Sequence, residues 1–251
     1  MYTNLNHVNE HLRYQKVVLI PPVTSCYLHV AAEIDQFFLP FQWLKSSKKR
    51  HFISLAKEWC QALTMDGGVI NASVFSAVII PPGKGKFLKE RDHVHQARFD
   101  VCILIEVINQ EVLAAIRGSE YFYRIEQWLR KYSRFFYTLE AKNVMQIQPV
   151  DHSRQGIFLF NYFYGDNLQK TLGIWEYTAG YFQQETGLNN SSVLLPVVPA
   201  DSIYTIINHC RWDRLADILP TLIFKQSFRD YVLAHFYANQ VAPMPILYRL
   251  E

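Results

Sequence analysis

The same order of predicted strands and helices occurs twice along the chain. In the second half, an apolar strand over 156–164 precedes a helix, two strands over 192–198 and 202–211, a helical region over 212–239 with a break at Pro220, and a closing strand. The first helix repeats its apolar residues at spacings of four and three, which places them on one face. They are Leu168, Leu172, Trp175, Ala179 and Phe182. This half therefore predicts the order β-α-β-β-α-β.

The first half repeats that order more loosely. A strand lies within 16–34, and an amphipathic helix then ends at a pair of glycines. Strands over 69–80 and 98–107, a helix in two pieces over 110–134 and a strand over 138–147 complete the series. Two successive copies of one supersecondary order indicate an internal repeat.

A four-stranded sheet of this order has helices on only one face, so its other face must be buried against something. A second copy in the same chain supplies that cover. We therefore predict an α+β fold of two ferredoxin-like modules, over 16–147 and 156–251, packed sheet to sheet as a fused pseudo-dimeric α/β barrel. A monomer is expected. The alternative is that each module pairs with another molecule.

Composition excludes several classes of protein. Half of the 251 residues are hydrophobic and 15% are aromatic, which is enough to form a full hydrophobic core. The apolar runs are too short for a helix that spans a membrane. The start of the chain lacks the pattern of a secretory signal, so we expect a cytoplasmic protein. A formal charge of +3 is too small for a nucleic-acid partner, and the basic runs over 45–50 and 83–91 are expected to be solvated loops.

The sequence shows no clear cluster of metal ligands. The four cysteines are far apart in apolar segments, which favours reduced thiols over disulfides or a zinc site. His93 and His95 have a spacing that can bind metal, but no acidic or cysteine cluster adjoins them. We therefore assign no metal.

Asn161 stands at the centre of the apolar strand over 156–164. A buried amide without partners costs about 1–3 kcal/mol, so it is either satisfied by neighbours or available to a ligand. Both interpretations stay open at this point. His209 is expected to face away from Cys210 and Trp212, because consecutive residues of a strand point to opposite faces.

The span over 155–251 resembles the antibiotic-biosynthesis-monooxygenase group of the dimeric α/β-barrel superfamily, and the first half resembles a more diverged member. Four features carry the resemblance: an asparagine in the first strand, a glycine that ends the helix, a strand that runs into tryptophan, and a Ser-Phe pair before the second helix. They are Asn161, Gly187, Trp212, Ser227 and Phe228.

The resemblance implies a cofactor-independent monooxygenase that acts on an aromatic or polyketide-like small molecule. In that group an asparagine and a tryptophan line a pocket between sheet and helices, which implies catalytic roles for Asn161 and Trp212. The first half has Val107 near the tryptophan position and no asparagine in its first strand, so the site is expected in the second module. The further residues expected to bind substrate or exchange protons are Tyr162, Tyr164, Tyr204, Phe228 and His235.

Two alternatives remain open. The sequence offers no clear general base with a charged orienting group, which favours a non-catalytic ligand-binding or scaffold module. The haem-degrading branch of the group needs an axial histidine, but the matching position is Val232, and His235 lies three residues further on. Haem binding is therefore the minor alternative, and no cofactor is expected.

Overall fold

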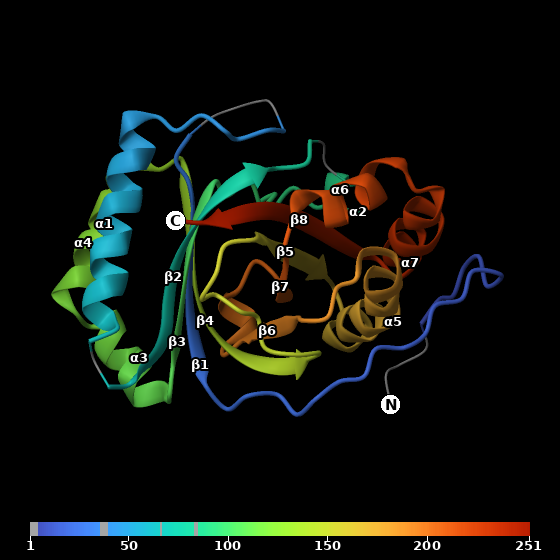
Figure 1. Ribbon diagram of the computed structural model, residues 1–251, viewed down its shortest axis with the longest axis horizontal. Coiled ribbons are helices and arrows are strands. Elements are labelled where there is room, and N and C mark those ends of the chain that lie inside the picture. Colours follow the sequence, from blue (N-terminus) through green and yellow to red (C-terminus); the bar gives the residue numbers. More distant parts are fainter. Residues whose placement is uncertain (1–4, 36–39, 66, 83–84) are drawn as a thin grey trace.

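The computed structural model describes residues 5–35, 40–65, 67–82 and 85–251, and within them eight antiparallel strands close into one barrel. Helices cover the barrel on two opposite sides (Figure 1). The strands are β1 (Cys26–Glu33), β2 (Val69–Ile79), β3 (Val101–Val107), β4 (Phe135–Gln146), β5 (Ile157–Gly165), β6 (Ser192–Pro196), β7 (Ile206–Trp212) and β8 (Val241–Leu250). The helices are α1 (Ser47–Leu63), α2 (Lys86–Lys89), α3 (Gln110–Arg117), α4 (Glu120–Tyr132), α5 (Leu168–Thr186), α6 (Leu215–Phe224) and α7 (Ala234–Ala238), with a 3₁₀ turn η1 (Pro199–Asp201) and a π-helix η2 (Phe228–Leu233).

Strand order is the same in the two halves of the barrel. The first four strands are arranged β4-β1-β3-β2 and the last four β8-β5-β7-β6, so each half places its strands in the order fourth, first, third, second. The predicted α+β class and barrel are confirmed. The boundaries of the two predicted modules stay a prediction.

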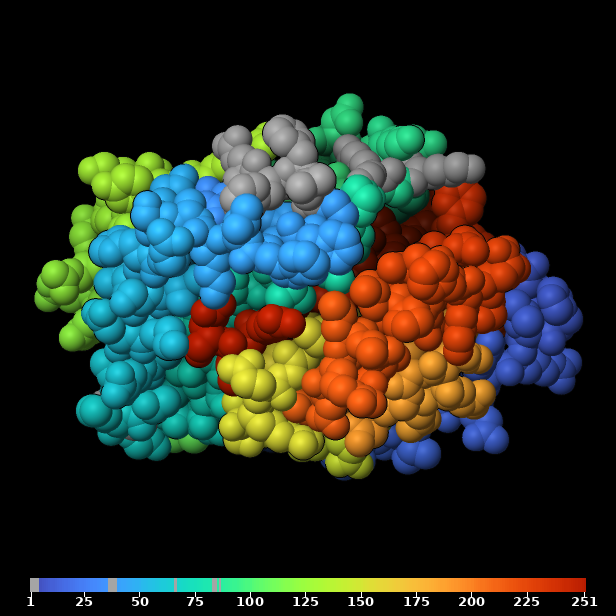
Figure 2. All heavy atoms as spheres, turned by 45° about the horizontal axis from the view of Figure 1, so that its top comes forward, coloured from blue at the N-terminus to red at the C-terminus, as the bar shows by residue number. Residues whose placement is uncertain are grey.

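The two sheets differ from the prediction in how they meet. They were expected to pack face to face, but they also join edge to edge, because β2 pairs with β8 and β4 pairs with β6. Figure 2 shows the C-terminal end of β8, in dark red, at the surface between blue residues of the first half and yellow residues of the second. Edge pairing satisfies backbone groups that two separate sheets would leave open.

The barrel interior is filled mainly by aromatic side chains. Along β5, Phe158, Phe160 and Tyr162 point inward and are completely buried, whereas Leu159 and Phe163 point outward to the helices. Strand alternation produces this division. The outer face of the first half packs against α1, α3 and α4 through a second apolar cluster.

The C-terminal helical region differs from the sequence-based interpretation. Pro220 was expected to break the helix, but it lies inside α6, and the break falls at Lys225, where the backbone turns extended. The chain then continues through the π-helix η2 into α7. A π-helix contains more residues per turn than an α-helix, so the side chains that follow it face directions that α-helical counting does not predict.

The segment before β1 lies across the second half as an extended strap over 5–20 (Figure 1). The ring of Tyr14 contacts those of Tyr181 and Tyr231, 4.8 and 4.6 Å away between centroids. The strap passes so close to α5 that a Cβ on Gly180 would lie 1.8 Å from the carbonyl oxygen of Gln15. A glycine at this position is therefore required for the strap to dock.

Gly180→Ala tests the docking of this strap. The added methyl group meets backbone, which cannot give way, so we expect a loss of about 1–3 kcal/mol in the free energy of unfolding and faster hydrogen exchange at Ile20, whose N–H donates to the carbonyl oxygen of Gln146. Gly67→Ala is the matched control, because no atom lies within 4 Å of its Cβ position. Equal behaviour of the two variants in denaturant unfolding and hydrogen exchange would contradict the tight contact.

His29 gives the barrel interior a pH dependence. Its side chain is fully buried, its Nε2 lies 2.9 Å from the hydroxyl of Tyr162, and burial lowers its pKa from 6.5 to about 3. Below pH 6.5 the imidazole of His29 binds a proton in the unfolded chain but not in the folded chain. The contribution of His29 to the free energy of unfolding is therefore largest above pH 6.5. It should fall by up to about 1.4 kcal/mol per pH unit between pH 6.5 and 3.

Urea unfolding at a series of pH values measures this slope. His29→Leu should reduce the slope by the contribution of one proton, and His11→Leu, which removes an exposed histidine, should leave it unchanged. An identical slope in His29→Leu and the parent protein would show that another group carries the acid sensitivity.

Candidate functional site

A cavity of about 460 Å³ lies between the outer face of the second sheet and the helices α5, α6, η2 and α7. One wall comes from the first half, through Pro81, Leu88 and Ala97. Most of the lining is apolar and aromatic. The polar lining residues are Gln96, Asn161, Thr178, Ser191, Asn208 and Cys210. Such a cavity is of the size and character that binds an apolar small molecule.

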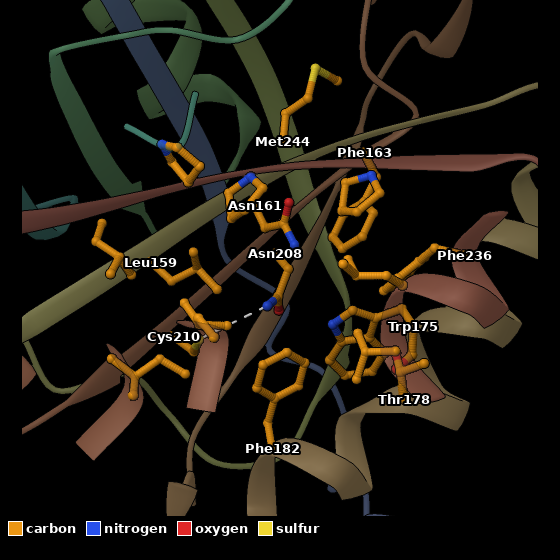
Figure 3. Close-up of a pocket in the computed structure, with 18 of the residues that line it drawn as sticks. Leu159, Asn161, Phe163, Trp175, Thr178, Phe182, Asn208, Cys210, Phe236 and Met244 are labelled. Carbon is orange, nitrogen blue, oxygen red and sulfur yellow. Dashed lines mark hydrogen bonds between the residues drawn. The ribbon is translucent and has the colours of Figure 1, made fainter. Parts of the chain in front are cut away.

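Asn161 points out of the barrel into this cavity (Figure 3). Its neighbours along β5, Phe160 and Tyr162, point the other way. The Oδ1 atom of Asn161 is buried and has no hydrogen-bond partner. A buried acceptor without a partner is costly, and this amide oxygen makes no hydrogen bond that would hold the fold together.

Asn208 lies directly opposite Asn161 in the pairing of β7 with β5. The hydroxyl of Ser191 donates to its Oδ1 at 2.5 Å, which fixes the amide so that its NH₂ group is the free end. The nearest acceptor described for that group is the Sγ of Cys210, at 4.0 Å, which is a weak contact. Two side-chain amides therefore lie side by side in the cavity wall.

Sequence analysis did not identify Asn208. A signal was present, because Asn208, Cys210 and Trp212 alternate on one face of the strand. What the sequence lacked was the register that brings Asn208 opposite Asn161.

Trp212 forms part of the cavity wall and is 4% exposed. Its indole N–H donates to the Oγ1 of Thr186 at 2.9 Å, so it is not free for a ligand. The contribution of Trp212 to the cavity is thus its apolar ring. Phe228 also lines the cavity.

The three tyrosines grouped with Asn161 from the sequence do not line the cavity. Tyr162 and Tyr204 lie inside the barrel, where the Tyr204 hydroxyl donates to the carbonyl oxygen of His95 at 3.1 Å. Tyr164 lies at the barrel end and donates to Asp166 at 3.0 Å. Residues two apart on a strand share a face, so Tyr162 and Tyr164 lie on the face opposite Asn161. Burial raises the pKa of Tyr162 well above its usual value.

His235 is also outside the cavity. It is completely buried, with its Nδ1 2.5 Å from the carbonyl oxygen of Tyr231 and its Nε2 accepting from the backbone N–H of Val8 at 3.3 Å. The imidazole thus faces the N-terminal strap. Val232 and Phe236 line the cavity instead. The structure thus places His235 away from the cavity, in contrast to the position expected from α-helical counting, which does not hold across η2.

Charged side chains are absent from the cavity lining among the described residues. Its most acidic group is the thiol of Cys210, and burial raises the pKa of that thiol. His95 belongs to the His-x-His pair that could bind a metal, and its Nε2 lies 2.7 Å from the Oε1 of Glu33. The described residues contain no group of three His, Cys, Asp or Glu that could hold a metal ion. The cavity is therefore suited to binding and orienting a neutral apolar molecule.

Comparison with known proteins gives matches of fold. No protein-family model matches the chain, and no curated protein matches its sequence. One solved structure is described as an anthrone oxidase-like protein and is 12% identical in sequence. The alignment covers 93% of this chain and 94% of that protein, with a TM-score of 0.65. A protein of Fusobacterium nucleatum, provisionally named a monooxygenase, is 9% identical over 90% of this chain and 91% of its own, with a TM-score of 0.54.

These similarities show a shared barrel fold.

The described helices include none long and apolar enough to cross a membrane.

Asn161→Ala and Asn190→Ala form a matched pair that separates an available amide from a structural one. Asn190 is buried and binds the backbone of Arg211 at both ends of its amide, each at 2.8 Å. We expect Asn190→Ala to cost about 1–3 kcal/mol of unfolding free energy and Asn161→Ala to cost little, because its oxygen has no partner to lose. Denaturant unfolding measures both. A loss in Asn161→Ala as large as in Asn190→Ala would show that the Asn161 amide is structural.

Proposed function

We propose that the protein is a monooxygenase that reacts an aromatic or polyketide-like molecule directly with O₂ in the cavity of its second half. The observation that carries the proposal is the pair of adjacent amides, Asn161 and Asn208, in the wall of a mainly apolar cavity. The fold shared with a protein described as anthrone oxidase-like supports the same class of substrate.

The two amides suit a substrate that carries a carbonyl and a hydroxyl near the reacting carbon. The N–H groups of Asn208 would donate to the carbonyl oxygen and stabilise the negative charge that develops there when an adjacent C–H bond loses its proton. The free Oδ1 of Asn161 would accept a hydrogen bond from the hydroxyl. Ser191 holds the Asn208 amide in the orientation that this requires.

Since no carboxylate, imidazole or amine lines the cavity in the described part of the chain, the C–H proton must pass to water at the mouth of the cavity, and the substrate itself must be acidic enough to release it. An electron-rich carbanion, stabilised as an enolate, can pass an electron to O₂ directly. For a methylene carbon the balanced change is CH₂ plus O₂ giving C=O plus H₂O, so both hydrogens leave in the water. The protein contributes orientation, charge stabilisation and exclusion of water.

The aromatic side chains of the cavity wall exclude water from the reacting carbon. Trp175 and Phe182 line it (Figure 3), as does Trp212, and these rings could pack against a planar ring system. Aromatic side chains bury large apolar areas, so they supply most of the binding energy and keep water from the carbanion.

The alternative function is ligand binding without turnover. The absence of an ionisable side chain from the described lining favours it, because a substrate that is not already acidic would bind and remain unchanged. Haem has less support, since the position expected for an axial histidine is Val232 and His235 faces the strap.

Oxygen uptake with hydroxylated anthrones and hydroquinones tests the proposal. We expect turnover by the parent protein and a loss of about 10²-fold in kcat/KM for Asn208→Ala, the cost typical of removing one donor to a developing oxyanion. Asn161→Ala should lose activity as well. Asn71→Ala, which changes an asparagine of β2 outside the cavity lining, is the matched control.

Three results would count against this function. Saturable ligand binding, followed by fluorescence, without O₂ uptake would favour the binding module. Activity lost on dialysis against a chelator and restored by metal would contradict cofactor independence. A histidine-ligated haem spectrum on adding haemin would support the minor alternative.

A further inference from the structure

A second, smaller cavity lies inside one end of the barrel and has a volume of about 60 Å³. We call it the Glu106 cavity. It is separate from the larger cavity, because its side chains point into the barrel and those around Asn161 point out. Unlike the aromatic interior next to it, it gathers several polar groups, among them Glu106, Gln146 and His152.

Residues far apart in sequence build this cavity. Tyr27 and Glu106 are opposite each other on β1 and β3. Gln146, Ser192 and His209 form a row across β4, β6 and β7. The connection between β4 and β5 adds His152 as a cap. Both halves of the chain and their linker thus contribute.

The hydrogen bonds fix which nitrogen of each histidine carries a proton. The Nδ1 of His209 lies 3.0 Å from the carbonyl oxygen of Leu159, which can only accept, so Nδ1 is protonated. The Nε2 of His209 is 2.7 Å from the Nε2 of His152. Burial lowers the pKa of His209, so that ring is neutral and its Nε2 accepts. His152 must therefore donate from Nε2.

Burial also lowers the pKa of His152, to about 4, so at neutral pH its Nδ1 carries a lone pair. This nitrogen is an acceptor on a residue that lines the Glu106 cavity. Two oxygens are further acceptors.

Glu106 accepts from Ser25 at 2.5 Å and from Tyr27 at 2.8 Å. Both donors use the same oxygen, Oε1, which leaves Oε2 for another partner. Gln146 is 2% exposed, and its Oε1 has no hydrogen-bond partner. An amide oxygen buried this deeply without a donor is costly, so a bound group that donates a hydrogen bond to it would be stabilised.

We propose that the Glu106 cavity binds a small primary ammonium ion. A primary ammonium group carries three N–H donors and no acceptor, which matches the three acceptors on Glu106, Gln146 and His152. Its positive charge pairs with the carboxylate. A water-sized position needs about 10–15 Å³, so the volume suits a molecule of a few heavy atoms, such as methylammonium or ethylammonium.

Other occupants fit less well. An anion would face the carboxylate of Glu106. A metal ion lacks a set of three His, Cys, Asp or Glu side chains among the described residues. Water alone would satisfy the hydrogen bonds but would leave the carboxylate of Glu106 without a counterion. The experiment below distinguishes a water-filled cavity from one that binds an ammonium ion.

The test titrates the full chain with methylammonium chloride at constant ionic strength. Tetramethylammonium chloride is the matched control, because it has the same charge and no N–H donor. We expect methylammonium to give a saturable rise in melting temperature, together with a saturable change in the ¹⁵N signal of His152 Nδ1. Tetramethylammonium should give neither. Benzylammonium, which exceeds the cavity in size, should also fail.

Glu106→Gln should weaken methylammonium binding at least tenfold while keeping the shape of the side chain. Glu140→Gln is the control, since Glu140 lies on the outer face of β4 near α3, 3.5 Å from Arg117. Gln146→Leu gives a second test that leaves Glu106 and its two partners intact, and it should weaken binding as well. Equal responses to the two cations would show a water-filled cavity and overturn the proposal. Undiminished binding in both Glu106→Gln and Gln146→Leu would overturn it too.

Discussion

Closure of the barrel by the pairs β2–β8 and β4–β6 is the interaction on which the rest of the structure depends. Without it, each four-stranded sheet would expose two edges and one apolar face. With it, the two inner faces enclose a common aromatic core, and the outer faces are left for the helices. The two cavities described above consequently lie on the helix side of a sheet and at one end of the barrel.

Strand alternation then divides the chemistry between two places. On β7, Asn208 points outward into the large cavity, and His209 points inward to the Glu106 cavity. The outward side is mainly apolar, with an amide pair in its wall, which suits a neutral aromatic ligand. The inward side concentrates acceptors around a carboxylate, which suits a small cation. One strand thus forms a wall of both cavities.

Several features followed from local sequence patterns. The repeated order of elements could be predicted, because periods of two and 3.6 residues report which face is buried. The barrel followed from the need to cover the bare face of each sheet. The location of Asn161, Trp212 and Phe228 between sheet and helices was expected only from the family resemblance. The same period of two should have separated Tyr162 from Asn161. That error came from grouping residues by proximity in the sequence rather than by face.

The sequence by itself determined the element order, the apolar faces and the presence of a polar residue in the first strand of the second half, since these depend on neighbouring residues. Only the tertiary structure decided the edge pairing, the register that sets Asn208 opposite Asn161, the turning of His235 away from the cavity after a π-helix, and the cavity that Glu106 shares with the linker residue His152. Glu106 and His152 lie 46 positions apart, and Asn161 and Asn208 lie 47 apart. Contacts over such separations are set by the packing of whole sheets, which no local period encodes.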